Sequence, residues 1–154
     1  MKRFRFRLQP VLDFREHQER MAKIEVAKAR QNIIDCSKKI EALTKDLNDT
    51  ARDLDLQTQK GMSVERFRFF TNYLSSIEVL ITREENRRKI LIRQLSDKQR
   101  ALKQKIIERK TLETLKNKQK DTYYNDLRNM LQKEADDMVA IRRKEEIEDG
   151  IRSV

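Results

Sequence analysis

The chain has 154 residues, of which 40% are charged and 37% hydrophobic, with a formal net charge of +10. Two glycines and one proline are too few to supply the turns that sheet folds need. A single cysteine excludes a disulfide framework, so we expect a reducing, cytoplasmic compartment. No apolar run of about 18 residues is present, which argues against a membrane span. The composition is typical of long helices.

The first 60 residues carry a heptad pattern. Eleven of the fourteen a and d positions between residues 8 and 54 are apolar, in one unbroken register. Such a narrow stripe predicts a coiled-coil seam on a helix over about 8–60, with Pro10 in its first turn. Cys36 occupies a d position, so we interpret it as a small core residue rather than a nucleophile. The three exceptions to the apolar pattern are Arg15, Glu19 and Thr50.

A turn is predicted at residues 61–63. Gly61 suits the position just past a helix end, and Ser63 is a candidate N-cap for the next helix. That second helix is predicted over about 64–148, with Gly150 ending it. Its register holds as far as Leu102, with Glu84 and Arg88 as the polar members, and then weakens, which predicts a stutter in the coiled coil.

The predicted fold class is therefore all-α. Two long helices form an antiparallel coiled-coil hairpin, as a single domain over 1–154, with a longer C-terminal helix and a frayed C-terminus. Folding at the predicted turn places residue 4 beside residue 118 and leaves the chain beyond about 119 without an intramolecular partner. That overhang has an apolar stripe, so we expect it to dock on another protein; the alternative is that it frays.

The positive charge is concentrated in one segment. Residues 83–120 carry a net charge of +9, whereas residues 121–154 carry −3. The basic segment either steers an acidic partner or is a solvated helix face. No glycine-rich phosphate loop, metal-ligand spacing or nucleophile–base pair is present, and His17 stands alone. We therefore predict a protein that is not an enzyme and has no cofactor, metal or small-molecule substrate.

Two aromatic groups are candidate binding surfaces. In the N-terminal group, phenylalanines alternate with arginines, a combination favoured at interfaces. The same residues could instead close the open end of the hairpin against residues 110–118. The second group opens the second helix: Phe67 and Phe70 can fill the seam, whereas Phe69 and Tyr73 share a neighbouring helix face.

The N-terminal pattern Phe4-x-Phe6-x-Leu8-x-x-Val11-Leu12-x-x-Arg15 resembles the start of flagellar export proteins of the FliJ type. The layout is similar over essentially the whole chain: a first helix of about 50 residues, a glycine-containing turn, aromatics opening the second helix, and a longer basic arm. The resemblance implies a component of the flagellar type III export apparatus, similar to the central stalk of rotary ATPases.

The resemblance also implies partners and a location. The partners would be the hexameric export ATPase, which the stalk stimulates, the cytoplasmic domain of the membrane export gate, and export chaperones. The location would be cytoplasmic and peripheral to the inner membrane, and the process flagellum biogenesis and hence chemotaxis and motility. Injectisome secretion systems contain a similar stalk protein, so that context stays open. Alone, the chain is expected to be a monomer.

Under this hypothesis, each end of the predicted hairpin binds a different partner. The open end would enter the ATPase ring and the turn end would face the gate. Leu43, Leu47 and Ile77 are also seam candidates. The ATPase-binding residues would be Arg3, Phe4, Arg5, Phe6, Arg7, Leu8, Tyr123, Tyr124, Leu127, Leu131 and Met138. The gate-binding residues would be Leu43, Leu47, Phe69, Tyr73, Ile77 and Leu80.

Two other classes of function compete with the stalk. A basic coiled coil could bind nucleic acid through its phosphates, but the 83–120 segment lacks aromatics for base stacking and carries no recognition motif. A homodimeric structural coiled coil could instead pair its overhangs across a two-fold axis. Binding that survives about 0.15 M salt would favour the first, and a dimer in light scattering would favour the second.

Overall fold

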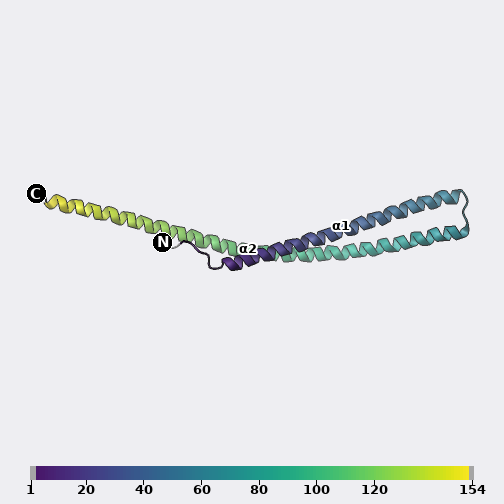
Figure 1. Cartoon of the computed structure of the whole chain (residues 1–154), viewed down its shortest axis with the longest axis horizontal. Helices are drawn as coiled ribbons and strands as arrows, with labels where there is room; N and C mark the ends of the chain where they lie inside the picture. Colours follow the sequence, from purple (N-terminus) through teal and green to yellow (C-terminus); the bar gives the residue numbers. More distant parts are fainter. Residues whose placement is uncertain (1–2, 153–154) are drawn as a thin grey trace. The chain divides into compact units, whose positions relative to one another are not determined.

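The computed structural model describes the backbone of residues 3–152 and the side chains of residues 3–143. It contains two helices, α1 (Gln9–Gln59, 51 residues) and α2 (Val64–Arg152, 89 residues), and no strand within the described backbone. The prediction of an all-helical chain with two long helices is confirmed (Figure 1). None of the helical sequence in the described part is long and apolar enough to cross a membrane.

The chain divides into two compact units, each with parts of both helices. The central unit comprises His17–Ile106, and the terminal unit comprises the residues up to Glu16 together with those from Ile107 onward. In the central unit, later residues of α1 contact earlier residues of α2. Glu25 pairs with Lys98, Lys39 with Glu84, and Asp46 with Tyr73.

The loop between the helices is built as its residue types predict. Gly61 has a φ of +90° and its N–H donates to the carbonyl of Thr58 at 3.1 Å, so glycine provides the left-handed conformation that ends α1. The Ser63 hydroxyl accepts a hydrogen bond from the N–H of Arg66 at 3.3 Å and thereby caps α2.

The heptad positions of α1 form the packed face. The a and d side chains from residue 12 to residue 54 are all buried or half-buried, so most apolar burial lies along this seam. Cys36 is 5% exposed, as its interpretation as a core residue requires. Glu19, an exception to the apolar pattern, is also buried and forms an ion pair with Lys23 at 2.7 Å. The buried apolar residues of the two helices are Leu12, Val26, Ala29, Cys36, Leu54 and Ile77.

The register of α2 differs from the prediction beyond Leu102. Instead of a stutter, half-buried positions continue at alternating three- and four-residue spacing, and several are cationic. Long basic side chains can bury their methylene stems there while the charged groups reach solvent. These regularly spaced positions are 98, 102, 105, 109, 112 and 116, and residues 106 and 108 are half-buried as well.

The C-terminal end of α2 also differs. The helix continues through Gly150 to Arg152, and the only glycine with positive φ in the described chain is Gly61. Glycine lowers helix stability but ends a helix only where it adopts the left-handed conformation. The C-terminus was expected to fray beyond about residue 148; the helix runs as far as Arg152, and residues 153 and 154 lie outside the described residues.

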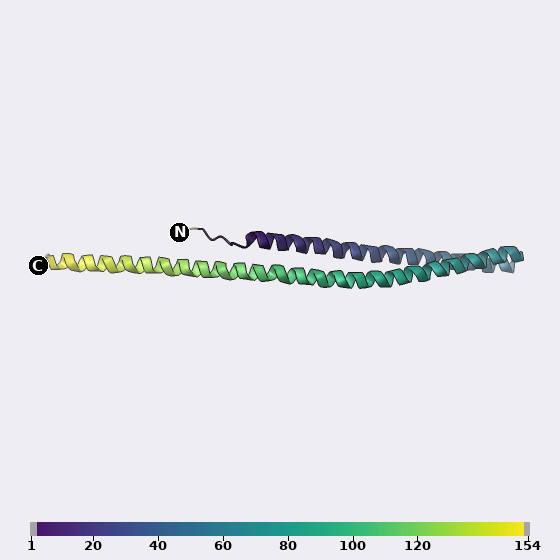
Figure 2. The ribbon, with the colours of Figure 1, turned by 90° about the horizontal axis from the view of Figure 1, so that it is seen from below.

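In the terminal unit, the chain before α1 is not helical. Residues 3–6 have no regular secondary structure and residues 7 and 8 form a turn, visible as a thin loop before α1 in Figure 2. Phe4 contacts Tyr123, with ring centroids 5.7 Å apart, rather than lying beside residue 118. An extended residue advances about 3.3 Å and a helical residue about 1.5 Å. The non-helical residues between Phe4 and α1 therefore carry Phe4 further along α2 than a helical segment of the same length would.

Candidate functional sites

The aromatic cluster, consisting of Phe4, Tyr123 and Tyr124, joins the N-terminal segment to α2 in the terminal unit. The ring of Phe4 meets that of Tyr123 at an interplanar angle of 50°, and Tyr123 meets Tyr124 edge-on at 5.4 Å. Phe6, two residues after Phe4, is 5% exposed. The expectation that α2 lacks intramolecular partners beyond residue 119 is therefore wrong at Tyr123, because the N-terminal segment reaches it.

Cations lie beside Phe4 of the aromatic cluster. Arg3, Arg5 and Arg7 alternate with the phenylalanines and are exposed. Together with Lys116 of α2 they line a groove of about 790 Å³. Four cations in one groove, with an aromatic edge beside it, form a surface that suits a carboxylate-rich protein partner.

The rest of the expected ATPase-binding set follows α2 away from this groove. Leu127 is half-buried, whereas Leu131 and Met138 are 56% and 65% exposed. Leu8 is 39% exposed on the N-terminal segment. The structure thus brings the N-terminal residues to Tyr123 and leaves Leu131 and Met138 as an exposed apolar continuation.

The expected gate-binding residues divide into two groups in the central unit. Leu43 and Leu47 are half-buried and Ile77 is 2% exposed, so these three take part in packing between the helices. Phe69, Tyr73 and Leu80, which we call the turn surface, are 69%, 42% and 44% exposed.

Two details near the turn surface were not predicted. Phe67, expected in the seam, is 43% exposed, because the seam begins with the half-buried Phe70. The hydroxyl of Tyr73 donates to Asp46 at 2.8 Å, and this hydrogen bond to a carboxylate raises the pKa of Tyr73 above its usual value of 10.0.

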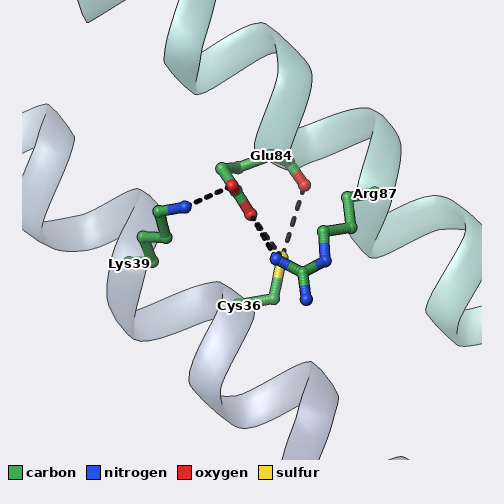
Figure 3. Close-up of polar contacts among 4 residues, drawn as sticks. All are labelled: Cys36, Lys39, Glu84 and Arg87. Carbon is green, nitrogen blue, oxygen red and sulfur yellow. Dashed lines mark hydrogen bonds and ion pairs between the residues drawn. The ribbon is translucent and has the colours of Figure 1, made fainter.

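A polar layer crosses the seam of the central unit (Figure 3). Its residues are Cys36, Lys39, Glu84 and Arg87. Glu84 is 7% exposed, and its carboxylate accepts from Lys39 at 2.5 Å and pairs with Arg87 at 3.5 Å. The Cys36 thiol donates to the main-chain carbonyl of Glu84 at 3.4 Å. The hydrogen bond from Lys39 lowers the pKa of Glu84 despite the opposing effect of burial.

This layer was only partly visible in the sequence. Glu84 lies in the α2 register, but its partner Lys39 lies beside the α1 seam rather than in it. Whether Lys39 and Glu84 pair therefore depends on how far α1 is displaced along α2. Within residues 3–143, no group of three or more histidine, cysteine or carboxylate side chains is placed to hold a metal ion. Every buried polar side-chain atom in the same range has a hydrogen-bond partner.

Taken together, the structure defines a two-helix protein whose candidate sites are surfaces for macromolecules. The chain belongs to the flagellar FliJ protein family, which matches residues 4–146. Comparison with curated proteins and with solved structures gives no match. As a member of this family, the chain is a component of the flagellar export apparatus, and the family is a structural and export component rather than a class of enzymes.

Proposed function

We propose that this chain is a non-enzymatic stalk that binds and stimulates the hexameric export ATPase. In this proposal the helices form one antiparallel coiled-coil hairpin, with the longer C-terminal helix extending past the N-terminus. The observation that carries the proposal is the cationic groove of Arg3, Arg5, Arg7 and Lys116 beside the aromatic cluster. Such a surface suits an acidic collar inside a protein ring.

The apolar continuation along α2 supplies the second half of the proposed ATPase contact. Leu131 and Met138 are exposed beyond the last aromatic contact, and burying exposed apolar side chains favours association. Tyr124 and the half-buried Leu127 connect this continuation to the cationic groove.

The opposite end of the pairing is proposed to contact the export gate. The turn surface has three exposed apolar residues on the first part of α2, and exposed aromatic residues favour protein interfaces. Leu43, Leu47 and Ile77 support this surface from the packed side. We also propose that export chaperones are bound, that the protein works in the cytoplasm at the inner face of the membrane, and that it is a monomer before assembly.

The experiment is ATP hydrolysis by the export ATPase of the same organism, with and without the full chain. We expect stimulation that is lost in Arg3→Glu/Arg5→Glu/Arg7→Glu and reduced in Leu131→Glu/Met138→Glu. The second variant leaves the Phe4–Tyr123 contact in place, which truncation at residue 118 would not.

A matched control changes the charge equally elsewhere. Lys89→Glu/Arg93→Glu/Lys103→Glu alters three exposed cations of the central unit and should keep full stimulation. No stimulation by the unaltered chain at concentrations well above that of the ATPase would contradict the proposal. Equal loss in the control would show a general charge effect and would contradict the assigned contact.

A further inference from the structure

A second groove lies in the central unit, beside the polar layer. It is lined by Lys39 of α1 and by Leu80, Arg83, Arg87 and Ile90 of α2, and has a volume of about 760 Å³. Leu80 and Ile90 are 44% and 55% exposed. The groove therefore combines exposed apolar side chains with cationic ones.

The apolar residues of this groove continue the turn surface along one flank of α2. Phe69, Tyr73, Leu80 and Ile90 follow one another at intervals of four, seven and ten residues. At 3.6 residues per turn these intervals are about 1.1, 1.9 and 2.8 turns, so the four side chains form a stripe within about 100° on one flank of α2. From Phe69 to Ile90 the stripe is about 32 Å long, the length of a helix of about 20 residues.

The charge of the groove is strongly one-sided. Glu84 is its only carboxylate, and that carboxylate is already occupied by Lys39 and Arg87. Arg83 is exposed, and no ion pair of Arg83 is found among the described side chains. The groove has three cations and one carboxylate, and that carboxylate is already paired with two of the cations. Arg83 therefore has no counter-charge within the groove.

From the stripe and its charge we propose that this groove binds an amphipathic helix of about 20 residues whose polar edge is acidic. The partner helix lies along α2, with its apolar face on Leu80 and Ile90 and its carboxylates at Arg83 and Arg87. This is the helix-in-groove mode of recognition. The inference deepens the proposed gate contact by stating the chemistry of the partner segment, and it rests on that proposed function for the partner's identity alone.

The test uses the full chain and two labelled helical peptides of about 20 residues. Both have leucines spaced to match the stripe; one has glutamates and the other lysines at the positions facing Arg83 and Arg87. Fluorescence anisotropy measures each dissociation constant. We expect the glutamate peptide to bind at least about tenfold more tightly, as charge complementarity requires. Equal affinity, or tighter binding of the lysine peptide, would overturn the proposal.

Variants locate the binding site. Arg83→Glu/Arg87→Gln should remove the preference for the glutamate peptide, and the glutamine avoids placing a second carboxylate beside Glu84. The matched control Arg93→Glu/Arg100→Gln makes the same charge change at exposed residues that do not line the groove, and Arg100 likewise has a carboxylate three residues before it. Loss of the preference in the control as well, or its retention in the first variant, contradicts the assigned site.

Stimulation of the ATPase is measured on the same preparations. We expect Arg83→Glu/Arg87→Gln to keep stimulation, because its changes lie outside the cationic groove of the terminal unit. Failure of stimulation in the unaltered chain would contradict the proposed function. Binding of an acidic helix in the groove is decided by the peptide preference alone.

Discussion

The ammonium group of Lys39 on α1 lies 2.5 Å from a carboxylate oxygen of Glu84, and Glu84 is buried between the helices. A buried carboxylate is costly unless it is paired and hydrogen-bonded. Here Lys39, Arg87 and the Cys36 thiol supply the partners. The polar layer therefore favours one offset of α1 against α2, because a shifted pairing would leave Glu84 among apolar side chains.

This relationship predicts a dependence of stability on acid pH. The pKa of Glu84 is lowered by the Lys39 hydrogen bond, and that of Glu25 by Lys98 and Lys28, from a usual value of 4.5. The unfolded chain thus takes up protons at higher pH than the folded chain. The stabilisation is complete above the usual value and is lost as the pH falls through the lowered value.

Thermal unfolding followed by circular dichroism should therefore show a midpoint that falls as the pH is lowered below the usual carboxyl value of 4.5. Glu84→Gln should be less stable at neutral pH and less sensitive to acid, because it cannot lose that ion pair. Glu85→Gln, an exposed neighbour, is the control and should follow the unaltered chain. An acid dependence that is the same in Glu84→Gln would contradict this assignment.

The packing of the seam gives a second prediction. Ile77 is 2% exposed, so Ile77→Ala leaves a cavity and should lower the free energy of unfolding by about 2–4 kcal/mol. Val79, two residues away, is 67% exposed, and Val79→Ala should change it by less than about 0.5 kcal/mol. Urea denaturation compares the two, and equal effects would place Ile77 outside the packed seam.

The aromatic contact of the terminal unit can be tested by hydrogen exchange. Aromatic pairs contribute about 0.5–1.5 kcal/mol beyond their buried area. Phe4→Ala should therefore speed amide exchange around Tyr123 by about two- to tenfold, if those amides exchange through local opening. Phe14→Ala, which alters a 55% exposed ring on α1, should leave these amides unchanged. Unchanged exchange in Phe4→Ala would show that the contact does not hold this part of α2.

The loop provides a fourth prediction. A side chain at Gly61 would meet no atom within 4 Å, so any cost of Gly61→Ala comes from its φ of +90° alone. We expect a loss of about 1 kcal/mol in the free energy of unfolding, and a smaller loss for Gly61→Asn because asparagine tolerates the left-handed region. Urea denaturation measures both, and an alanine variant as stable as the parent would show that the loop changes conformation.

Much of the fold could be predicted because one periodic signal dominates the sequence. The heptads of α1 predicted the burial of Leu12, Val26, Cys36 and Leu54, and all four are buried. The apolar pattern of α2 wrongly placed Phe67 in the seam. An aromatic residue at the start of a helix fits such a pattern whether or not the partner helix reaches it.

The candidate sites were harder to predict because they depend on offsets between segments. Lys39 and Glu84 become partners only at one pairing of the helices, and neither residue marks that pairing by itself. The charge of residues 83–120 was visible in the sequence, but which of its cations line a groove was not. Arg83 and Arg87 do so because Leu80 and Ile90 lie on the same flank.

The length of the non-helical N-terminal segment determines which residues of α2 the ring of Phe4 reaches. Each residue added between Phe6 and Gln9 in extended form would move the ring of Phe4 about 3.3 Å, or about two residues, along α2. One added residue would turn the ring away from α2, because successive side chains of an extended segment point to opposite sides, whereas two would restore its direction and advance it by about 6.6 Å. The spacing between the first phenylalanines and α1 should therefore vary in steps of two wherever the aromatic contact is kept.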